Sequence, residues 1–257
     1  MIKTVTACIF ALALSGGAQA ASIRVTVTNA APAGGTFITP VWVGFHDGTF
    51  DTYDPGSPVS AAMERLAEDG GTSFLSAAFA ASGAGSADGT LGMAPIAPGA
   101  SLSMMFNLDA LAASSRWFSY ASMVVPSNDA FIANGNPLAF QIFDTMGGFL
   151  GADFFVVGSM VRDAGSEVND EIPMNTAFFG QSVPNTGVDE NGVVTTHPGF
   201  LPVASGGILA SAMFANADFT LPGYQIARIQ VEAVPEPATW ALIALAVPLC
   251  LLRARRR

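Results

Sequence analysis

The sequence has few charged residues and very few basic ones. Only 12% of its 257 residues are charged, and lysine occurs once, as Lys3. Long apolar runs are also missing between the two ends of the chain, which argues against a polytopic membrane protein, because each span needs about 20 apolar residues. Disorder is excluded as well, since disordered chains combine low hydrophobicity with high net charge, whereas 51% of these residues are hydrophobic.

The first 20 residues have the three parts of a signal peptide in the expected order. Lys3 supplies the positive start, residues 5–14 form a short apolar core, and Ala18-Gln19-Ala20 fits the small-x-small cleavage rule. We therefore expect residues 1–20 to be removed and the mature chain to begin at Ala21. The alternative is a buried N-terminal helix.

The C-terminal segment 233–257 also has three parts. Pro235-Glu236-Pro237 precedes an apolar run, residues 238–252, and an arginine cluster ends the chain. This order resembles the PEP-CTERM sorting signal of Gram-negative bacteria. The resemblance implies a transmembrane sorting helix, transient anchoring in the inner membrane, processing by an exosortase-type protease, and delivery to the cell surface or outside the cell. The alternative is a plain single-span anchor.

The middle of the chain is strongly acidic once both ends are set aside. Lys3 and four terminal arginines lie in the ends, as does Glu236, which leaves five basic and 19 acidic side chains and a net charge of −14. Nucleic acid is excluded as a partner, because its binding needs clustered Lys and Arg. Both cysteines, Cys8 and Cys250, also lie in the ends, so the mature domain has no disulfide and no thiolate site.

Short segments with strand periodicity fill residues 21–232. Ile23, Val25 and Val27 alternate with polar residues, which is typical of a half-buried strand. One short helix is predicted over residues 58–69, with Gly70 ending it. We therefore predict an all-β fold, a single antiparallel β-sandwich with one short helix, flanked by the two targeting segments. The predicted strands are 22–29, 40–46, 72–79, 101–108, 117–125, 138–143, 153–161 and 224–232.

Acidic residues follow two segments that should meet at one end of the sandwich. Asp129 lies at a turn tip, strand 138–143 leads away from it, and strand 153–161 returns to the same end. The following segment contains four carboxylates: Asp163, Glu167, Asp170 and Glu171. Converging carboxylates repel one another unless a cation compensates them, and Ca²⁺ prefers such oxygen ligands. Ordinary solvated loop carboxylates are the alternative.

An ordered set of segments resembles the spondin domain of bacteria, which is related to the N-terminal domain of F-spondin and mindin. The segments are residues 23–29, 39–42, 126–129, 163–167 and 185–187. The resemblance implies a C2-like β-sandwich with Ca²⁺ at one end, and it places the metal ligands at Asp129, Asp163 and Glu167. The family has Pro at the position of Asn128 and Asp at the position of Glu167.

Two other features predict structure rather than chemistry. Residues 185–192 contain part of a calcium-loop pattern but lack its full spacing, so they are better interpreted as a polar turn. Trp42 and Trp117 lie in strand-like segments and are predicted to belong to the core.

These patterns favour an exported, non-catalytic adhesion or binding module of the cell surface or biofilm matrix, with surface polysaccharide or protein as its ligand and Ca²⁺ as its cofactor. One alternative is a surface hydrolase that acts on exopolysaccharide through paired carboxylates such as Asp47 and Asp51. Another is a structural matrix component. The chain has only two histidines and no nucleophile-elbow or zinc-protease motif, which argues against a histidine-based catalytic centre.

Overall fold

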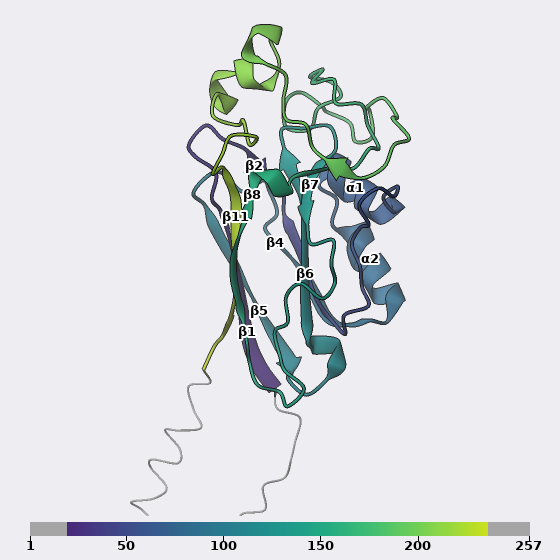
Figure 1. Ribbon diagram of the computed structural model, residues 1–257, viewed down its shortest axis with the longest axis vertical. Helices are drawn as coiled ribbons and strands as arrows, with labels where there is room; N and C mark the ends of the chain where they lie inside the picture. The colour runs from purple at the N-terminus through teal and green to yellow at the C-terminus, as the bar shows by residue number, and fades with distance from the viewer. Residues whose placement is uncertain (1–19, 236–257) are drawn as a thin grey trace, which may run out of the picture.

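The computed structural model describes residues 20–235, which form two antiparallel sheets and two α-helices (Figure 1). The smaller sheet has the strand order β5-β1-β11-β8. Its side chains alternate, with Ile23, Val25 and Val27 fully buried, because one face packs on the core and the other meets solvent. Its strands are β1 (Ala20–Asn29), β5 (Ser101–Asp109), β8 (Ala152–Val157) and β11 (Gln225–Ala233).

The larger sheet has the order β10-β9-β7-β6-β3-β4, and β2 pairs with β6. Every residue of β3 is buried, because the smaller sheet covers one face of the larger sheet and the helices cover the other. Its strands are β2 (Phe37–Ile38), β3 (Val41–His46), β4 (Gly85–Leu91), β6 (Trp117–Val125), β7 (Ala130–Ala133), β9 (Arg162–Asp163) and β10 (Thr195–Thr196).

The main hydrophobic core lies between the two sheets, which gives the molecule its β-sandwich-like character. A second core lies beneath the helices α1 (Ala61–Asp69) and α2 (Ser73–Ser82), where Trp42 packs against Phe50 and Phe79. Short 3₁₀ turns complete the structure: η1 (Ala113–Ser115), η2 (Gly158–Met160), η3 (Val203–Ser205), η4 (Ile208–Ala210) and η5 (Ala212–Phe214).

The predicted helix ends where α1 ends, but a second helix follows it that was not predicted. Helix α1 ends at Asp69, and Gly70 closes it in the left-handed conformation. Ser60 caps its start by accepting a hydrogen bond from Met63 N at 3.3 Å. The prediction of only one helix was wrong, because α2 occupies the segment expected to be strand 72–79.

Two strand predictions in the middle of the chain were also wrong or partly wrong. Residues 138–143 form only isolated bridges, through Gln141 and Phe143, instead of a strand. The expected strand 153–161 ends at Val157, where η2 begins, and β8 belongs to the smaller sheet.

The predicted targeting segments fall almost wholly outside the described residues. Only Ala20 of the signal peptide is described, as the first residue of β1, and of the sorting motif only Pro235 is described, so that Glu236 and Pro237 lie beyond. Within residues 20–235, no helix has the length and apolar character needed to cross a membrane.

Candidate cation site at the β7–β9 edge

Asp129 and the segment that begins at Asp163 lie side by side, as the sequence suggested. The two segments meet because β7 pairs directly with β9, which places Ala130 opposite Asp163. Ala164 N also donates to the carbonyl of Asp129 at 3.3 Å. Ser127 fixes the turn before β7, since its Oγ donates to Val124 O and accepts from Ala130 N. Pairing across a sheet edge, rather than a returning hairpin, brings the two acidic segments together.

Asp129 is a buried carboxylate with one free oxygen. The residue is 0% exposed. Its Oδ2 accepts hydrogen bonds from Ser166 N at 2.9 Å, Ser166 Oγ at 3.2 Å and Glu167 N at 3.1 Å. Its Oδ1 has no hydrogen-bond partner among the described residues. Burial, and then repulsion by Asp163, raise the pKa of Asp129 to about 7.

Glu167 repeats this pattern beside it. The residue is 3% exposed, and its Oε1 accepts a hydrogen bond from Gly187 N at 3.0 Å. Its Oε2 has no such partner in the described part of the chain. Burial raises the pKa of Glu167 to about 7, with further contributions from the charges of Glu68 and Asp129. Gly187 is needed for this contact, because a Cβ there would lie 2.0 Å from the carboxyl carbon of Glu167.

Asp163 has both oxygens engaged by the protein. Its Oδ1 accepts from Gly165 N at 2.7 Å and its Oδ2 from Asn169 Nδ2 at 2.6 Å. His197 supports Asn169: Nδ1 of His197 accepts from Gly199 N, so its Nε2 carries the proton and donates to Asn169 Oδ1 at 3.1 Å. Burial lowers the pKa of His197 to about 4, which keeps the ring neutral at pH 7. Asp163 therefore shapes the loop that presents Glu167.

Glu68 of helix α1 joins this group, although no sequence pattern indicated it. It is 3% exposed, and burial raises its pKa. Its Oε2 lies 3.2 Å from Nη2 of Arg65, which also pairs with Asp69. Glu64 and Glu68, four residues apart on a predicted helix, could have suggested a shared acidic face, but the helix pattern does not say which loop that face meets.

Asp170 and Glu171 anchor loops, and each oxygen of their carboxylates accepts a hydrogen bond. Asp170 accepts hydrogen bonds from Ile172 N and from the amides of Asn128 and Asn175. The carboxylate of Glu171 accepts one from Leu201 N and one from Ile208 N.

Replacing Glu171 with Ala should loosen the loop between residues 199 and 210, because two main-chain N–H groups lose their acceptor. We expect a loss of about 1–3 kcal/mol in the free energy of unfolding, with faster amide exchange at Leu201 and Ile208. Hydrogen exchange followed by mass spectrometry measures both effects. Unchanged exchange in this loop would contradict the anchoring role.

The two carboxylates of the hydrolase alternative lie on the surface, whereas Asp129 and Glu167 are buried. Asp47 and Asp51 are both exposed, and Asp47 accepts hydrogen bonds from the main chain and hydroxyl of Thr49.

The 185–192 segment is an irregular loop, as predicted, and Asn185 and Asn191 take left-handed conformations within it.

Two buried carboxylates offer oxygen donors at this position. No three histidine, cysteine, aspartate or glutamate side chains among residues 20–235 are grouped closely enough to hold a metal ion together. Asp129 and Glu167, however, each have one buried carboxylate oxygen that accepts no hydrogen bond from the described residues. Calcium completes such a pair with carbonyl oxygens and water. No family model matches the chain, and no curated protein matches it in sequence.

Proposed function

We propose that the chain is an exported, non-catalytic binding module of the cell surface or extracellular matrix, and that Ca²⁺ stabilises one end of its C2-like β-sandwich. The observation that carries the calcium proposal is the pair of buried carboxylates, Asp129 and Glu167, each with an oxygen that accepts no hydrogen bond. A buried carboxylate without compensation is costly, so a proton or a cation must neutralise it. A hard divalent cation suits a pair of oxygen donors better than one proton does.

The residues divide into ligands and supports. Asp129 and Glu167 would hold the ion directly, and the bound ion would compensate their negative charges. Asp163 is proposed to act by fixing the 163–167 loop through its hydrogen bonds to Gly165 and Asn169. The spondin-like order of segments supports a binding role, and the two targeting segments support export and processing by an exosortase-type protease. Surface polysaccharide or protein is the proposed ligand class.

Thermal unfolding with and without Ca²⁺ tests this proposal. A ligand that binds only the native state, at about thirty times its Kd, stabilises it by about 2 kcal/mol. For a domain of this size that corresponds to a Tm increase of roughly 4–8 °C over the value in EDTA. Asp129→Asn keeps the shape of the side chain and should abolish the increase.

The matched control is Glu232→Gln, which removes one negative charge from an exposed position at the end of β11. It should keep the full calcium response. The same melting curve in EDTA and in millimolar Ca²⁺ for the wild-type protein would rule out the site.

A further inference from the structure

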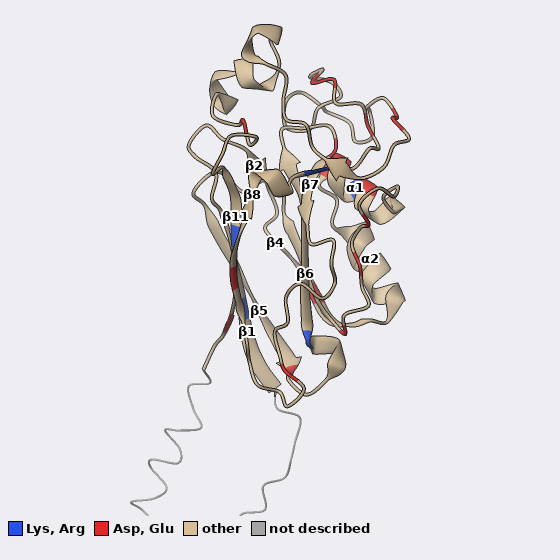
Figure 2. Cartoon of the chain, viewed as in Figure 1, with Lys and Arg blue, Asp and Glu red and all other residues tan. Residues whose placement is uncertain are grey.

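A cleft of about 410 Å³ lies between helix α1 and the 185–192 loop, next to the 163–167 segment. Three carboxylates line it, from Glu64 and Glu68 of α1 and from Asp189 of the loop. Acidic residues mark this side of the molecule in Figure 2, on α1 and on the loops above it. The remaining lining residues are Pro58, Val59, Ala164, Gly165, Ser166, Asn185, Asn191 and Gly192.

Glu68 is compensated only in part by the positive charge near it. It is only 3% exposed yet lines the cleft, and its Oε2 accepts no hydrogen bond among the described residues. The guanidinium of Arg65, 3.2 Å away, is shared with Asp69 and with the Asn185 side chain, so it compensates Glu68 only in part. Burial is the main cause of the raised pKa of Glu68; Ser166 and Arg65 oppose it, and the charges of Glu64 and Asp189 add to it. The cleft therefore attracts positive charge.

The spacing of these carboxylates fits an organic cation better than a metal ion. They do not form a group of three that could hold one ion, in the part of the chain that the structure describes. A cleft of this volume is also far larger than a calcium coordination sphere. A guanidinium or ammonium group carries several N–H donors, which reach carboxylates that stand apart from one another.

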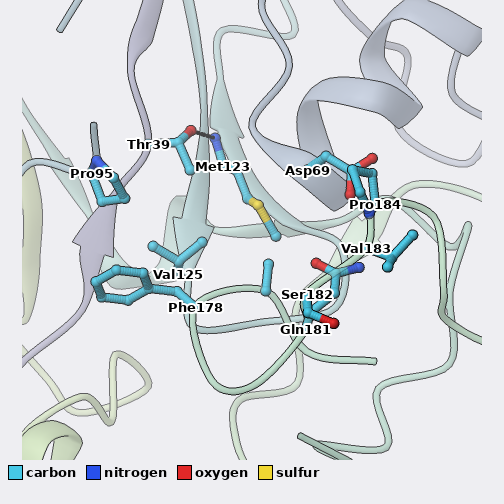
Figure 3. Close-up of a pocket in the computed structure, with 11 residues that line it drawn as sticks. Thr39, Asp69, Pro95, Met123, Val125, Phe178, Gln181, Ser182, Val183 and Pro184 are labelled. Carbon is cyan, nitrogen blue, oxygen red and sulfur yellow. Dashed lines mark hydrogen bonds between the residues drawn. The ribbon is translucent and has the colours of Figure 1, made fainter. Parts of the chain in front are cut away.

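A second hollow adjoins the cleft, and part of its wall is apolar. Val125, Phe178, Val183 and Pro184 contribute to its wall, and its volume is about 260 Å³ (Figure 3). Residues 183–185 separate the two hollows, because Val183 and Pro184 line this one and Asn185 lines the cleft. Asn185 N donates to Asp69 Oδ1 at 3.2 Å, which fixes this wall to the end of α1. A free polyamine would use the acidic cleft alone, whereas a polypeptide segment can fill both hollows.

We propose that the acidic cleft binds an arginine or lysine side chain of a partner polypeptide, and that an apolar side chain of the same segment occupies the adjoining pocket. Charge complementarity selects the basic residue, and the apolar part of the adjoining wall, formed by Val125, Phe178 and Val183, selects its neighbour. Neither Asp129 nor Glu167 lines this cleft, although Ser166, which donates to Asp129, does.

Fluorescence anisotropy with the full-length protein and a labelled peptide tests this proposal. The peptide carries leucine and two arginines, and a matched peptide carries citrulline in place of each arginine. We expect saturable binding of the arginine peptide that weakens with salt, and at least about tenfold weaker binding of the citrulline peptide. The variant that combines Glu64→Gln and Asp189→Asn should also bind the arginine peptide at least about tenfold more weakly.

Three controls show whether peptide binding depends on this cleft. Glu232→Gln changes the net charge elsewhere and should bind like the wild type. The wild type should bind the arginine peptide in EDTA as tightly as in millimolar Ca²⁺, so failure of the calcium site and failure of the cleft are distinguishable. Circular dichroism confirms that the double variant is folded. Equal binding of both peptides, unchanged binding by the folded double variant, or binding of spermine as tight as that of the arginine peptide would overturn the proposal.

Discussion

Without divalent cations, the Asp129→Asn variant is expected to gain about 3 kcal/mol of stability relative to the wild type as the pH rises from 4.5 to 8. The pKa of Asp129 is raised to about 7 by burial and by Asp163, so the native protein binds a proton that the unfolded chain has already released above pH 4. The wild type therefore loses stability as the pH approaches 7. An asparagine at this position does not titrate, so the variant escapes the part of the loss that comes from Asp129.

The comparison with the variant is needed because the histidines act in the opposite direction. Burial lowers the pKa values of His46 and His197 to about 4, so both destabilise the native protein as the pH falls below about 6.5. Both proteins contain these histidines, and their contribution cancels in the difference. Urea unfolding of both proteins in EDTA across this pH range measures the effect, and a constant difference would show that Asp129 is ionised throughout. Saturating Ca²⁺ should remove the wild-type penalty above pH 7.

Replacing Trp42 with Ala should cost about 3–5 kcal/mol of unfolding free energy. The side chain is fully buried between β3 and the helices, with its ring 5.6 Å from that of Phe50 and 5.3 Å from that of Phe79. Its Nε1 donates a hydrogen bond to Asp88 Oδ2 at 3.0 Å. The variant leaves a cavity in the second core and removes the donor from Asp88.

Trp42→Phe separates these two contributions in large part, since it removes the hydrogen bond but keeps one aromatic ring in the core. We expect it to cost roughly 1–2 kcal/mol. Urea denaturation provides both values, with an unchanged m-value as evidence that the two-state transition persists. A loss below 1 kcal/mol for the alanine variant would mean that the helices do not pack on this side chain in solution.

The strands with clear alternation were the most predictable part of the fold. β1 follows the expected pattern closely, because one face of the smaller sheet is buried and the other is solvated. Trp42 lies in the core as predicted, whereas Trp117 is only half-buried. β4 was missed, since its sequence Gly-Ser-Ala-Asp-Gly-Thr-Leu has neither alternation nor an apolar run.

The error at α2 has a specific cause. Short apolar runs look alike in strands and buried helices, and residues 72–79 were predicted to be a strand. The alanines of α2 favour helix, and Leu75 and Phe79, four residues apart, are the two positions that it buries. That spacing is helical and could have corrected the assignment.

The location of the candidate site could be predicted from the sequence, but the residues that form it could not. The sequence placed Asp129, Asp163 and Glu167 near one another, and the pairing of β7 with β9 does so. Which carboxylates are compensated depends on main-chain N–H groups that only the folded loops bring into place, as Gly165 and Gly187 show. Glu68 could not be assigned, because its position depends on how α1 packs against the 163–167 loop.

The pairing of β1 with β11 also places the two ends of the described chain close together. Ile23 lies opposite Ala233, so the first and last described residues leave the sandwich at the same pole (Figure 1). The acidic loops lie at the other pole, and at roughly 3.3 Å per residue β1 spans about 30 Å between them. A molecule tethered by either end would therefore hold its acidic cleft outward, clear of the attachment surface and within reach of a neighbouring cell or fibre.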